Sequence, residues 1–434
     1  MKTSSSASSY SFRHFHPVVV TGIGVAGAAA VGAATFEQVL REGRSSVGYL
    51  TGMAYPNGKP LIGAEAEARE LQVGFQRYAP GLSRTAGRLF KISGKSVQAS
   101  SVAAAEAWQQ AGLEERSLNH ERIGIIVAGS NISPAVSYSA YKEYGEQPEL
   151  LHPRYALSYM DTNQIGVLSE MFGICGEGMT VGGASASGNA AILRASQWIQ
   201  LGLVDVCMVV GAMADLSPLE LQGYLNIGAY GGSGFEGAPK QACRPFDRRH
   251  EGFILGQTSA CLILECASSA ADSGAEVLAT VIGGAAALDG HSLSNPSEDG
   301  QVRTMKEALR RAGLPTSSID YINAHGTSTP LGDLTELASI RRVFGEHLGR
   351  VRINSTKALT GHCLYAAGVV EAASVIIQMK GGFLHPQINL EEPVSREHYF
   401  ATQKAEAADF TYALSNSYGF GGINTSIIFK KGLC

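Results

Sequence analysis

The sequence is poor in charged residues and has little net charge. Asp, Glu, Lys and Arg make up 17% of its 434 residues, and the formal net charge at pH 7 is −4. Proteins that bind nucleic acid or a membrane surface in bulk usually carry a large basic excess. The composition therefore argues against both functions, although it leaves room for a local basic patch.

The cysteines lack the paired spacing of zinc and redox motifs. No C-x-x-C occurs, and several of the cysteines lie in apolar runs; the seven positions are 175, 207, 243, 261, 266, 363 and 434. Unpaired cysteines in apolar surroundings behave as small hydrophobic side chains. We interpret them as reduced core thiols of a cytoplasmic protein that has no zinc site.

The N-terminal residues lack the apolar segment of a secretory signal. Residues 1–16 are rich in serine, so we predict a flexible leader. Residues 18–36 carry no charge and reach the length of a membrane span, but Gly22, Gly24 and Gly27 interrupt them. A buried strand, a glycine turn and a buried helix fit this stretch better than a span does.

Hydrophobic residues make up 45% of the chain and there are 52 glycines, which is typical of an α/β enzyme with tight turns. Apolar segments alternate with helical patterns, which predicts crossover units and a mostly parallel sheet. Strands are predicted at 18–24, 123–129, 179–184, 206–213 and 260–265, and again at 277–287, 321–324, 351–354, 412–416 and 425–429. Helices are predicted at 35–42, 100–111, 190–200, 302–312, 331–344 and 366–379.

This pattern restarts after about residue 270, which suggests an internal duplication. We predict one half over residues 17–270 and a second over residues 271–434. No linker rich in Pro, Gly or Ser separates them, so the two halves are expected to share an interface.

The segment from Thr180 to Ala191 reads as a strand, a glycine turn and the start of a helix. Ser185 stands at that helix N-terminus, where free backbone N–H groups and the helix dipole favour developing negative charge. The neighbouring glycines and alanines allow a substrate carbonyl to approach the backbone. The turn is suited to presenting a nucleophile, yet the residue there is a serine.

Three more polar loops follow predicted strands, at the strand ends where α/β sheets bind ligands. One carries His325 with Thr327 and Thr329; another carries Lys357 and His362. The third is the glycine-rich segment 416–424 around Phe420. Two neutral imidazoles can each donate a hydrogen bond to one oxygen and stabilise an enolate. The backbone N–H groups of Ser185 and Phe420 are expected to form an oxyanion hole.

These four stretches together resemble the β-ketoacyl synthase family of the thiolase superfamily, and the resemblance extends from Val18 to Phe429. The segment Arg244–Asp247, followed by Gly252 and Phe253, supports it. The resemblance implies a duplicated, five-layered αβαβα thiolase fold and a homodimer. It also implies an acyl carrier protein as partner. The acyl group is then carried on the partner's phosphopantetheine arm, and the protein itself binds no cofactor or metal.

The resemblance also assigns roles to residues of this chain. His325 and His362 match the two catalytic histidines, and Lys357 and Glu371 match the supporting lysine and glutamate. Thr327 and Thr329 match the threonines that hold the pantetheine arm. Phe420 matches the gating phenylalanine. Three positions depart from the family pattern: Ser185 replaces the nucleophilic cysteine, Gln257 replaces an acid, and 294–296 replaces a T-x-P motif.

The serine changes the expected chemistry. A helix dipole contributes about 1 kcal/mol, under one pKa unit, which cannot ionise a serine hydroxyl near pH 7. We therefore expect acyl loading and condensation to be largely lost, whereas decarboxylation of a malonyl thioester needs only the two histidines. Within the family, such proteins resemble the decarboxylases of polyketide β-branching cassettes. These make acetyl-carrier protein, whose acetyl unit a hydroxymethylglutaryl-synthase-like enzyme adds to a β-ketone.

Three alternatives stay open at this point. The first is a non-catalytic partner of a ketosynthase, like a chain-length factor, although such subunits typically lose the histidines. The second is a serine variant, natural or engineered, of a condensing 3-oxoacyl-carrier-protein synthase. The third is a serine hydrolase, because residues 183–187 nearly match G-x-S-x-G, although no acid is clearly placed for a triad.

A separate feature is a set of basic residues at three- and four-residue spacing: Arg84, Arg88, Lys91 and Lys95. On one helix they share a face, which is usually just solvated and in some proteins docks an acidic partner.

Overall fold

The computed structural model describes residues 17–291 and 295–432. The predicted leader, residues 1–16, lies outside the described residues, as do Ser294 and Cys434. The central feature is an 11-stranded sheet with the order β12-β10-β9-β14-β15-β8-β1-β7-β6-β4-β5.

The strands and helices form two successive sets. The first set of the large sheet is β1 (Val18–Gly27), β4 (Ile123–Ala128), β5 (Gly178–Val181), β6 (Val206–Gly211) and β7 (Thr258–Cys266). The second is β8 (Ala279–Leu288), β9 (Tyr321–Asn323), β10 (Arg352–Asn354), β14 (Tyr412–Gly419) and β15 (Ile423–Lys431), with β12 (Tyr399–Phe400) at the edge. Two small sheets pair β2 (Gly48–Ala54) with β3 (Pro60–Gly63) and β11 (Phe383–Leu384) with β13 (Glu406–Ala407).

The first set of helices is α1 (Ala33–Glu42), α2 (Ala68–Tyr78), α3 (Arg84–Ile92), α4 (Lys95–Gln110), α5 (Pro134–Tyr144), α6 (Tyr155–Ser158), α7 (Thr162–Phe172), α8 (Ser187–Gln200) and α9 (Pro218–Asn226). The second is α10 (Ala267–Ser273), α11 (Glu298–Ala312), α12 (Pro330–Phe344), α13 (Lys357–Thr360) and α14 (Ala367–Gly381). Every predicted strand and helix overlaps one of these elements, because each carries an apolar run or stripe of the matching period.

The two halves of the sheet have the same topology. Counting only these long strands, each half places its first strand beside its last, then its fourth, second and third. The pairing directions also match, with two antiparallel pairs followed by two parallel ones. The halves join where Val18–Val20 of β1 pairs with β8. This repetition confirms the predicted duplication.

The prediction of a mostly parallel sheet is wrong. The five junctions from β14 through β15, β8, β1 and β7 to β6 are all antiparallel. The last strand of each half returns against its neighbour, and β14 reaches β15 through the tight turn 420–422 rather than through a crossover helix. Only crossover connections force parallel pairing.

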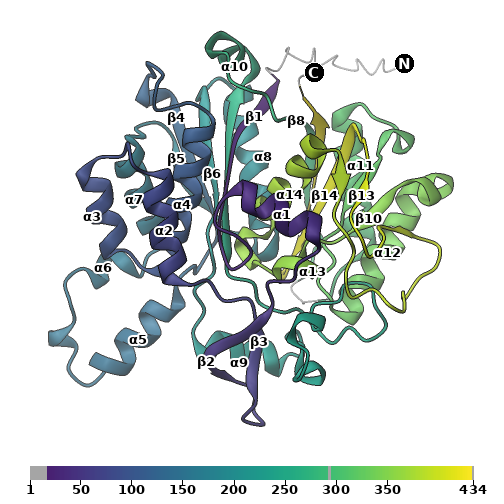
Figure 1. Ribbon diagram of the computed structural model, residues 1–434, viewed down its shortest axis with the longest axis horizontal. Helices are drawn as coiled ribbons and strands as arrows, with labels where there is room; N and C mark the ends of the chain where they lie inside the picture. The colour runs from purple at the N-terminus through teal and green to yellow at the C-terminus, as the bar shows by residue number, and fades with distance from the viewer. Residues whose placement is uncertain (1–16, 292–294, 433–434) are drawn as a thin grey trace, which may run out of the picture.

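Helices and sheet alternate in five layers (Figure 1). The helices α2, α3, α4 and α7 lie outside the first half of the sheet, and α11 and α12 lie outside the second. Between the halves run α8 and α14, which contact strands of both. This is the predicted αβαβα thiolase architecture.

The two central helices cross at a pair of glycines. A Cβ added to Gly188 of α8 would lie 2.6 Å from the backbone nitrogen of Val369, and one added to Gly368 of α14 would lie 2.5 Å from that of Asn189. Only glycine allows such a close backbone approach. The crossing brings the N-terminal ends of both helices together, and with them the loops that carry Ser185 and His362.

Two smaller predictions need correction. Arg84, Arg88 and Lys91 share the exposed side of α3, but a break at Ser93-Gly94 puts Lys95 on α4, where it lies 3.5 Å from Glu65. Among the cysteines, five are buried as predicted, whereas Cys175 is exposed.

Candidate active site

Ser185 lies in the turn between β5 and α8. The residue before it, Ala184, has φ of 47°, a conformation that non-glycine residues rarely adopt. Ser187 holds the turn in place, since its hydroxyl accepts a hydrogen bond from the Gly183 N–H at 2.8 Å and donates one to the Ala184 carbonyl at 2.7 Å. The half-buried hydroxyl of Ser185 is therefore presented at the N-terminal end of the central helix α8.

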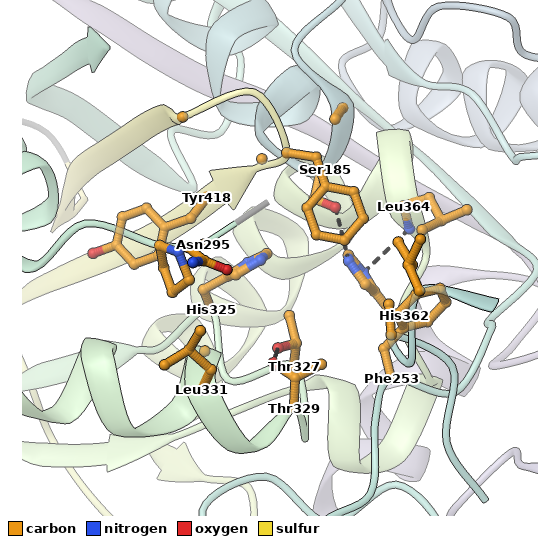
Figure 2. Close-up of a pocket in the computed structure, with 18 of the residues that line it drawn as sticks. Ser185, Phe253, Asn295, His325, Thr327, Thr329, Leu331, His362, Leu364 and Tyr418 are labelled. Carbon is orange, nitrogen blue, oxygen red and sulfur yellow. Dashed lines mark hydrogen bonds between the residues drawn. The ribbon is translucent and has the colours of Figure 1, made fainter. Parts of the chain in front are cut away.

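His362 follows α13 and faces Ser185. Its Nε2 lies 2.8 Å from the Ser185 Oγ, and its Nδ1 accepts a hydrogen bond from the Leu364 N–H at 3.3 Å. Leu364 adopts φ of 49°, a strained conformation for a leucine that the surrounding structure has to hold. Figure 2 shows these two hydrogen bonds on opposite sides of the His362 ring.

His325 follows β9 and stands on the other side of the same space. Its ring centroid is 5.5 Å from that of His362, with the two planes at 83°. The Lys357 ammonium lies 3.3 Å from its Nδ1 and donates to its backbone carbonyl at 2.6 Å. Figure 2 shows both imidazoles directed into the space beneath Ser185.

The hydrogen bonds fix where each imidazole carries its proton. Because each Nδ1 faces an N–H donor, it must act as an acceptor, and the ring hydrogen resides on Nε2. Burial, with the positive charge of Lys357, holds the pKa of both histidines well below the usual 6.5; His325 is 8% exposed and His362 3%. The site therefore offers two neutral Nε2–H donors.

Lys357 and Glu371 form a buried ion pair behind the histidines. The Glu371 carboxylate also accepts a hydrogen bond from the Ser417 hydroxyl at 3.3 Å. This pairing compensates the charge of the ammonium that orients His325, as buried charges require.

The loop after His325 is anchored by two buried acids that the sequence analysis missed. Glu336 accepts hydrogen bonds from the His325 N–H at 2.8 Å and the Gly326 N–H at 2.7 Å, and burial raises its pKa to about 7. Asp333 accepts from the Ser328 N–H at 3.1 Å. Both lie in the first turns of α12, three residues apart. Two acids at that spacing directly after a Thr/Ser loop are the sequence signal by which they could have been identified.

A cavity of about 340 Å³ opens onto these residues. It is lined by Ser185, His325, His362, Thr327, Thr329 and Phe420, so the structure brings these predicted residues together. Thr327 and Thr329 lie with their hydroxyls 2.7 Å apart. Lys357 and Glu371 stand behind this wall. The Phe420 side chain is 43% exposed and sits on a turn in which Gly421 and Gly422 both have positive φ, at 86° and 72°.

The departures from the family pattern have separate structural settings. The Gln257 amide oxygen accepts a hydrogen bond from the Ala66 N–H at 3.1 Å, away from the cavity lining. Asn295 and Pro296 line the cavity, whereas Ser294 lies outside the described residues.

The hydrogen bonds of His362 do not fit a serine hydrolase. A hydrolytic triad needs a carboxylate on the histidine Nδ1, so that Nε2 can remove the serine proton. Here the Nδ1 of His362 accepts a backbone N–H, which leaves Nε2 a donor towards Ser185. Within residues 17–291 and 295–432, no group of three or more His, Cys, Asp or Glu side chains is arranged to hold a metal ion.

The family models match nearly the whole chain. The model of the beta-ketoacyl synthase N-terminal domain matches residues 15–270, and that of the C-terminal domain matches residues 278–391. The chain belongs to the β-ketoacyl synthase family.

Among curated members of this family, the chain is 36% identical to "Polyketide biosynthesis malonyl-ACP decarboxylase PksF" of Bacillus subtilis, over 95% of this chain and 96% of the relative. A solved β-ketoacyl synthase from Burkholderia phymatum matches with a TM-score of 0.84 and 28% identity, covering 96% of this chain and all (100%) of that one. A type II polyketide ketosynthase solved with its acyl carrier protein shares the fold, with a TM-score of 0.81, 24% identity and coverage of 96% and 100%. No helix in the described part of this family member is long and apolar enough to cross a membrane.

Proposed function

We propose that this β-ketoacyl synthase family member decarboxylates malonyl-carrier protein to acetyl-carrier protein without condensing acyl groups. One observation carries the proposal. Two neutral imidazoles with their Nε2–H groups facing one cavity stand beside a hydroxyl, where a condensing enzyme has a thiol. The site thus has the parts for an enolate but lacks the nucleophile for loading an acyl chain.

The reaction needs no protein-held cofactor. The bond between the malonyl carboxylate and C2 breaks, CO2 leaves, and the bonding electrons form an enolate whose negative charge rests on the thioester oxygen. The Nε2–H groups of His325 and His362 donate hydrogen bonds to that oxygen and so lower the barrier. A water molecule then protonates C2, which gives the acetyl thioester and a hydroxide ion that the released CO2 takes up as bicarbonate. Both histidines act as fixed donors in this scheme and neither has to change its charge.

Ser185 has no part in bond making in this scheme. Its hydroxyl accepts the His362 Nε2–H at 2.8 Å and keeps that imidazole directed into the cavity until the thioester oxygen replaces it. No base faces the hydroxyl from His362, so the hydroxyl stays un-ionised and acyl loading does not occur.

The relatives support this proposal and its biological setting. PksF is described as a polyketide malonyl-ACP decarboxylase, and the type II ketosynthase was solved bound to its acyl carrier protein. By analogy, the partner of this chain is an acyl carrier protein, and its acetyl product supplies the two-carbon unit for polyketide β-branching.

The test is incubation of the purified protein with malonyl-loaded carrier protein, followed by intact mass measurement. The expected result is loss of the mass of CO2 from the carrier and no acyl adduct on the enzyme. A stable acyl-enzyme together with a condensed product would favour a condensing enzyme instead. An unchanged carrier would favour a non-catalytic partner subunit.

The matched variant for this test is Ser185→Ala. Because the serine accepts a hydrogen bond from His362 and forms no covalent bond, the alanine variant should keep the decarboxylation rate within about tenfold, the scale of one neutral hydrogen bond. A loss of 10⁴-fold or more would show that the hydroxyl reacts.

Arg84, Arg88 and Lys91 on the exposed side of α3 are a candidate docking surface for the acidic carrier protein. Reversing all three to Glu should raise KM for the carrier about tenfold at low salt, with a smaller effect at high salt, because exposed charges are screened. Reversing the exposed Lys306 on α11, on the far side of the molecule in Figure 1, is the control and should leave KM unchanged. A salt-independent effect would argue against electrostatic docking.

We also propose that the protein is a homodimer. Strand β5 is an edge of the large sheet, with Met179 36% exposed. An open strand edge is a surface that a second copy of the chain can cover by strand pairing.

A further inference from the structure

Beyond Ser185 and His362, the cavity ends in a wall of aromatic side chains. Tyr224 of α9 lies between Phe253 and Phe420, with ring centroids 5.2 Å and 6.5 Å away. Phe253 in turn meets the edge of the His362 ring at 5.5 Å. Tyr365 lines the cavity on the same side, directly after Leu364. Thr327 and Thr329 line the same cavity.

Tyr365 fills the junction between two parts of the core. It packs against the cluster that includes Ile132, beneath the first half of the sheet, and against the cluster around Leu221 and Phe253. At the end of β4, a Cβ added to Gly129 would lie 3.5 Å from the Tyr365 Cβ. Tyr365 therefore stands between the cavity, which it lines, and the end of β4.

The backbone around Tyr365 holds it in this place. The strained Leu364 before it donates its N–H to His362, and His362 pairs with Leu255 in a β-bridge. The residue after it, Ala366, presses on β6 so closely that a Cβ added to Gly211 would lie 2.9 Å from its Cα. A ring held on both sides by fixed backbone cannot move aside at low cost.

The opposite side of Tyr365 is fixed as well. The Asp161 carboxylate accepts hydrogen bonds from the Asn131 N–H at 2.7 Å and the Ile132 N–H at 2.8 Å, which ties down the loop after β4. Burial and the nearby Tyr224, Asp161 and Glu220 raise the pKa of the Tyr365 phenol, so it stays neutral. The wall is thus closed by a rigid, uncharged ring.

We propose that Tyr365, backed by Tyr224, sets the size of the acyl group that this site accepts, and restricts it to two- and three-carbon units. The inference rests on the proposed function, because it names the acyl size that the decarboxylating site takes. A condensing enzyme has to store a growing chain beside its nucleophile, whereas a malonyl decarboxylase has no such need. In this protein the thiol is absent, and in the proposal Tyr365 also takes up the space that a growing acyl chain would need.

A covalent probe in the Ser185→Cys background tests the size limit directly. The thiolate of that variant attacks the carbonyl of an acyl-carrier thioester, a new C–S bond forms, and the carrier's pantetheine thiol leaves with a proton. We expect labelling with acetyl, measured by intact mass, and octanoyl labelling at least tenfold slower, since each misfitting methylene discriminates roughly 10–200-fold. Adding Tyr365→Ala should raise the octanoyl-to-acetyl ratio at least tenfold.

Tyr365→Phe is the matched control, because it keeps the ring and removes only the hydroxyl. It should leave the ratio unchanged. A ratio of labelling rates cancels any loss of folded protein, so partial destabilisation of Tyr365→Ala does not obscure the result. The proposal is overturned if octanoyl labels the Ser185→Cys variant as fast as acetyl does, or if Tyr365→Ala leaves the ratio unaltered.

A second measurement covers the case in which the introduced thiol labels with neither group. Acetyl- and octanoyl-pantetheine amides are titrated by calorimetry into the wild type and Tyr365→Ala. Octanoyl binding that is weak in the wild type and at least tenfold tighter in the variant supports the proposal, and equal affinities refute it. Neither experiment involves loss of CO2, so failure of the malonyl assay and failure of the size limit are separate results.

Discussion

We expect His325→Ala and His362→Ala each to lower kcat for malonyl decarboxylation about 10²–10³-fold, the usual effect of removing one oxyanion donor. In the proposed mechanism each imidazole supplies one fixed Nε2–H to the enolate oxygen, and alanine supplies none. KM for the carrier should change little, because the lost hydrogen bonds strengthen only as charge develops on the oxygen. Steady-state kinetics with malonyl-carrier protein, read by mass, measures both constants.

The pH profile distinguishes donors from proton carriers. Because burial and Lys357 hold the pKa of both histidines well below 6.5, the imidazoles stay neutral as the pH falls through 6.5. An unperturbed catalytic histidine would make the rate fall as the pH drops below about 6.5. The wild-type rate should therefore show no such fall near pH 6.5. His120→Ala, which removes an exposed histidine bonded to the Gly173 carbonyl, is the matched control and should keep the full rate. Near-wild-type rates in both His325→Ala and His362→Ala would show that neither histidine contributes to catalysis.

The sequence is enough to place the elements and most of the site residues. Periodicity locates the ten longest strands of the large sheet and six of the helices, whereas α2, α5, α7 and α9 were not predicted. The loops with His325, Lys357 and His362 all follow strands, as predicted. Parallel strand ends meet at one edge of a sheet, which is why residues far apart in the chain converge here. The direction of β7 was not predictable in the same way, because a returning strand has the same apolar pattern in either direction. The direction of β15 could have been predicted, because its connection from β14 is too short for a crossover helix.

The supporting contacts needed the structure. The sequence around Leu364 does not predict that its backbone N–H fixes the tautomer of His362. The sequence around Tyr365 does not predict that this side chain lines a cavity shared with α9. The Leu364 contact joins residues two apart but requires a positive φ, and the position of Tyr365 depends on tertiary packing against two core clusters. For Glu336, the three-residue spacing from Asp333 is visible in the sequence, but its hydrogen bonds to the backbone N–H groups of His325 and Gly326 are not.

Replacing Lys357 with methionine is expected to have the largest effect on stability. The change leaves the Glu371 carboxylate buried without its cation, which should cost about 3–5 kcal/mol of unfolding free energy in a denaturant titration. The rate should fall as well, since the Nδ1 of His325 loses the donor that fixes its tautomer. The tautomer with Nε2 unprotonated offers a lone pair, rather than a hydrogen, to the enolate oxygen.

The double variant Lys357→Met with Glu371→Gln separates the two effects. It leaves no buried charge, and the amide still accepts the Ser417 hydroxyl, so at least half of the lost unfolding free energy should return. The decarboxylation rate should not return, because the donor to His325 is still missing. The non-additive term in the stability cycle then measures the ion pair, while kcat reports the orientation of His325. If the rate recovers along with the stability, Lys357 acts through folding alone, and the tautomer of His325 has to be fixed by other contacts.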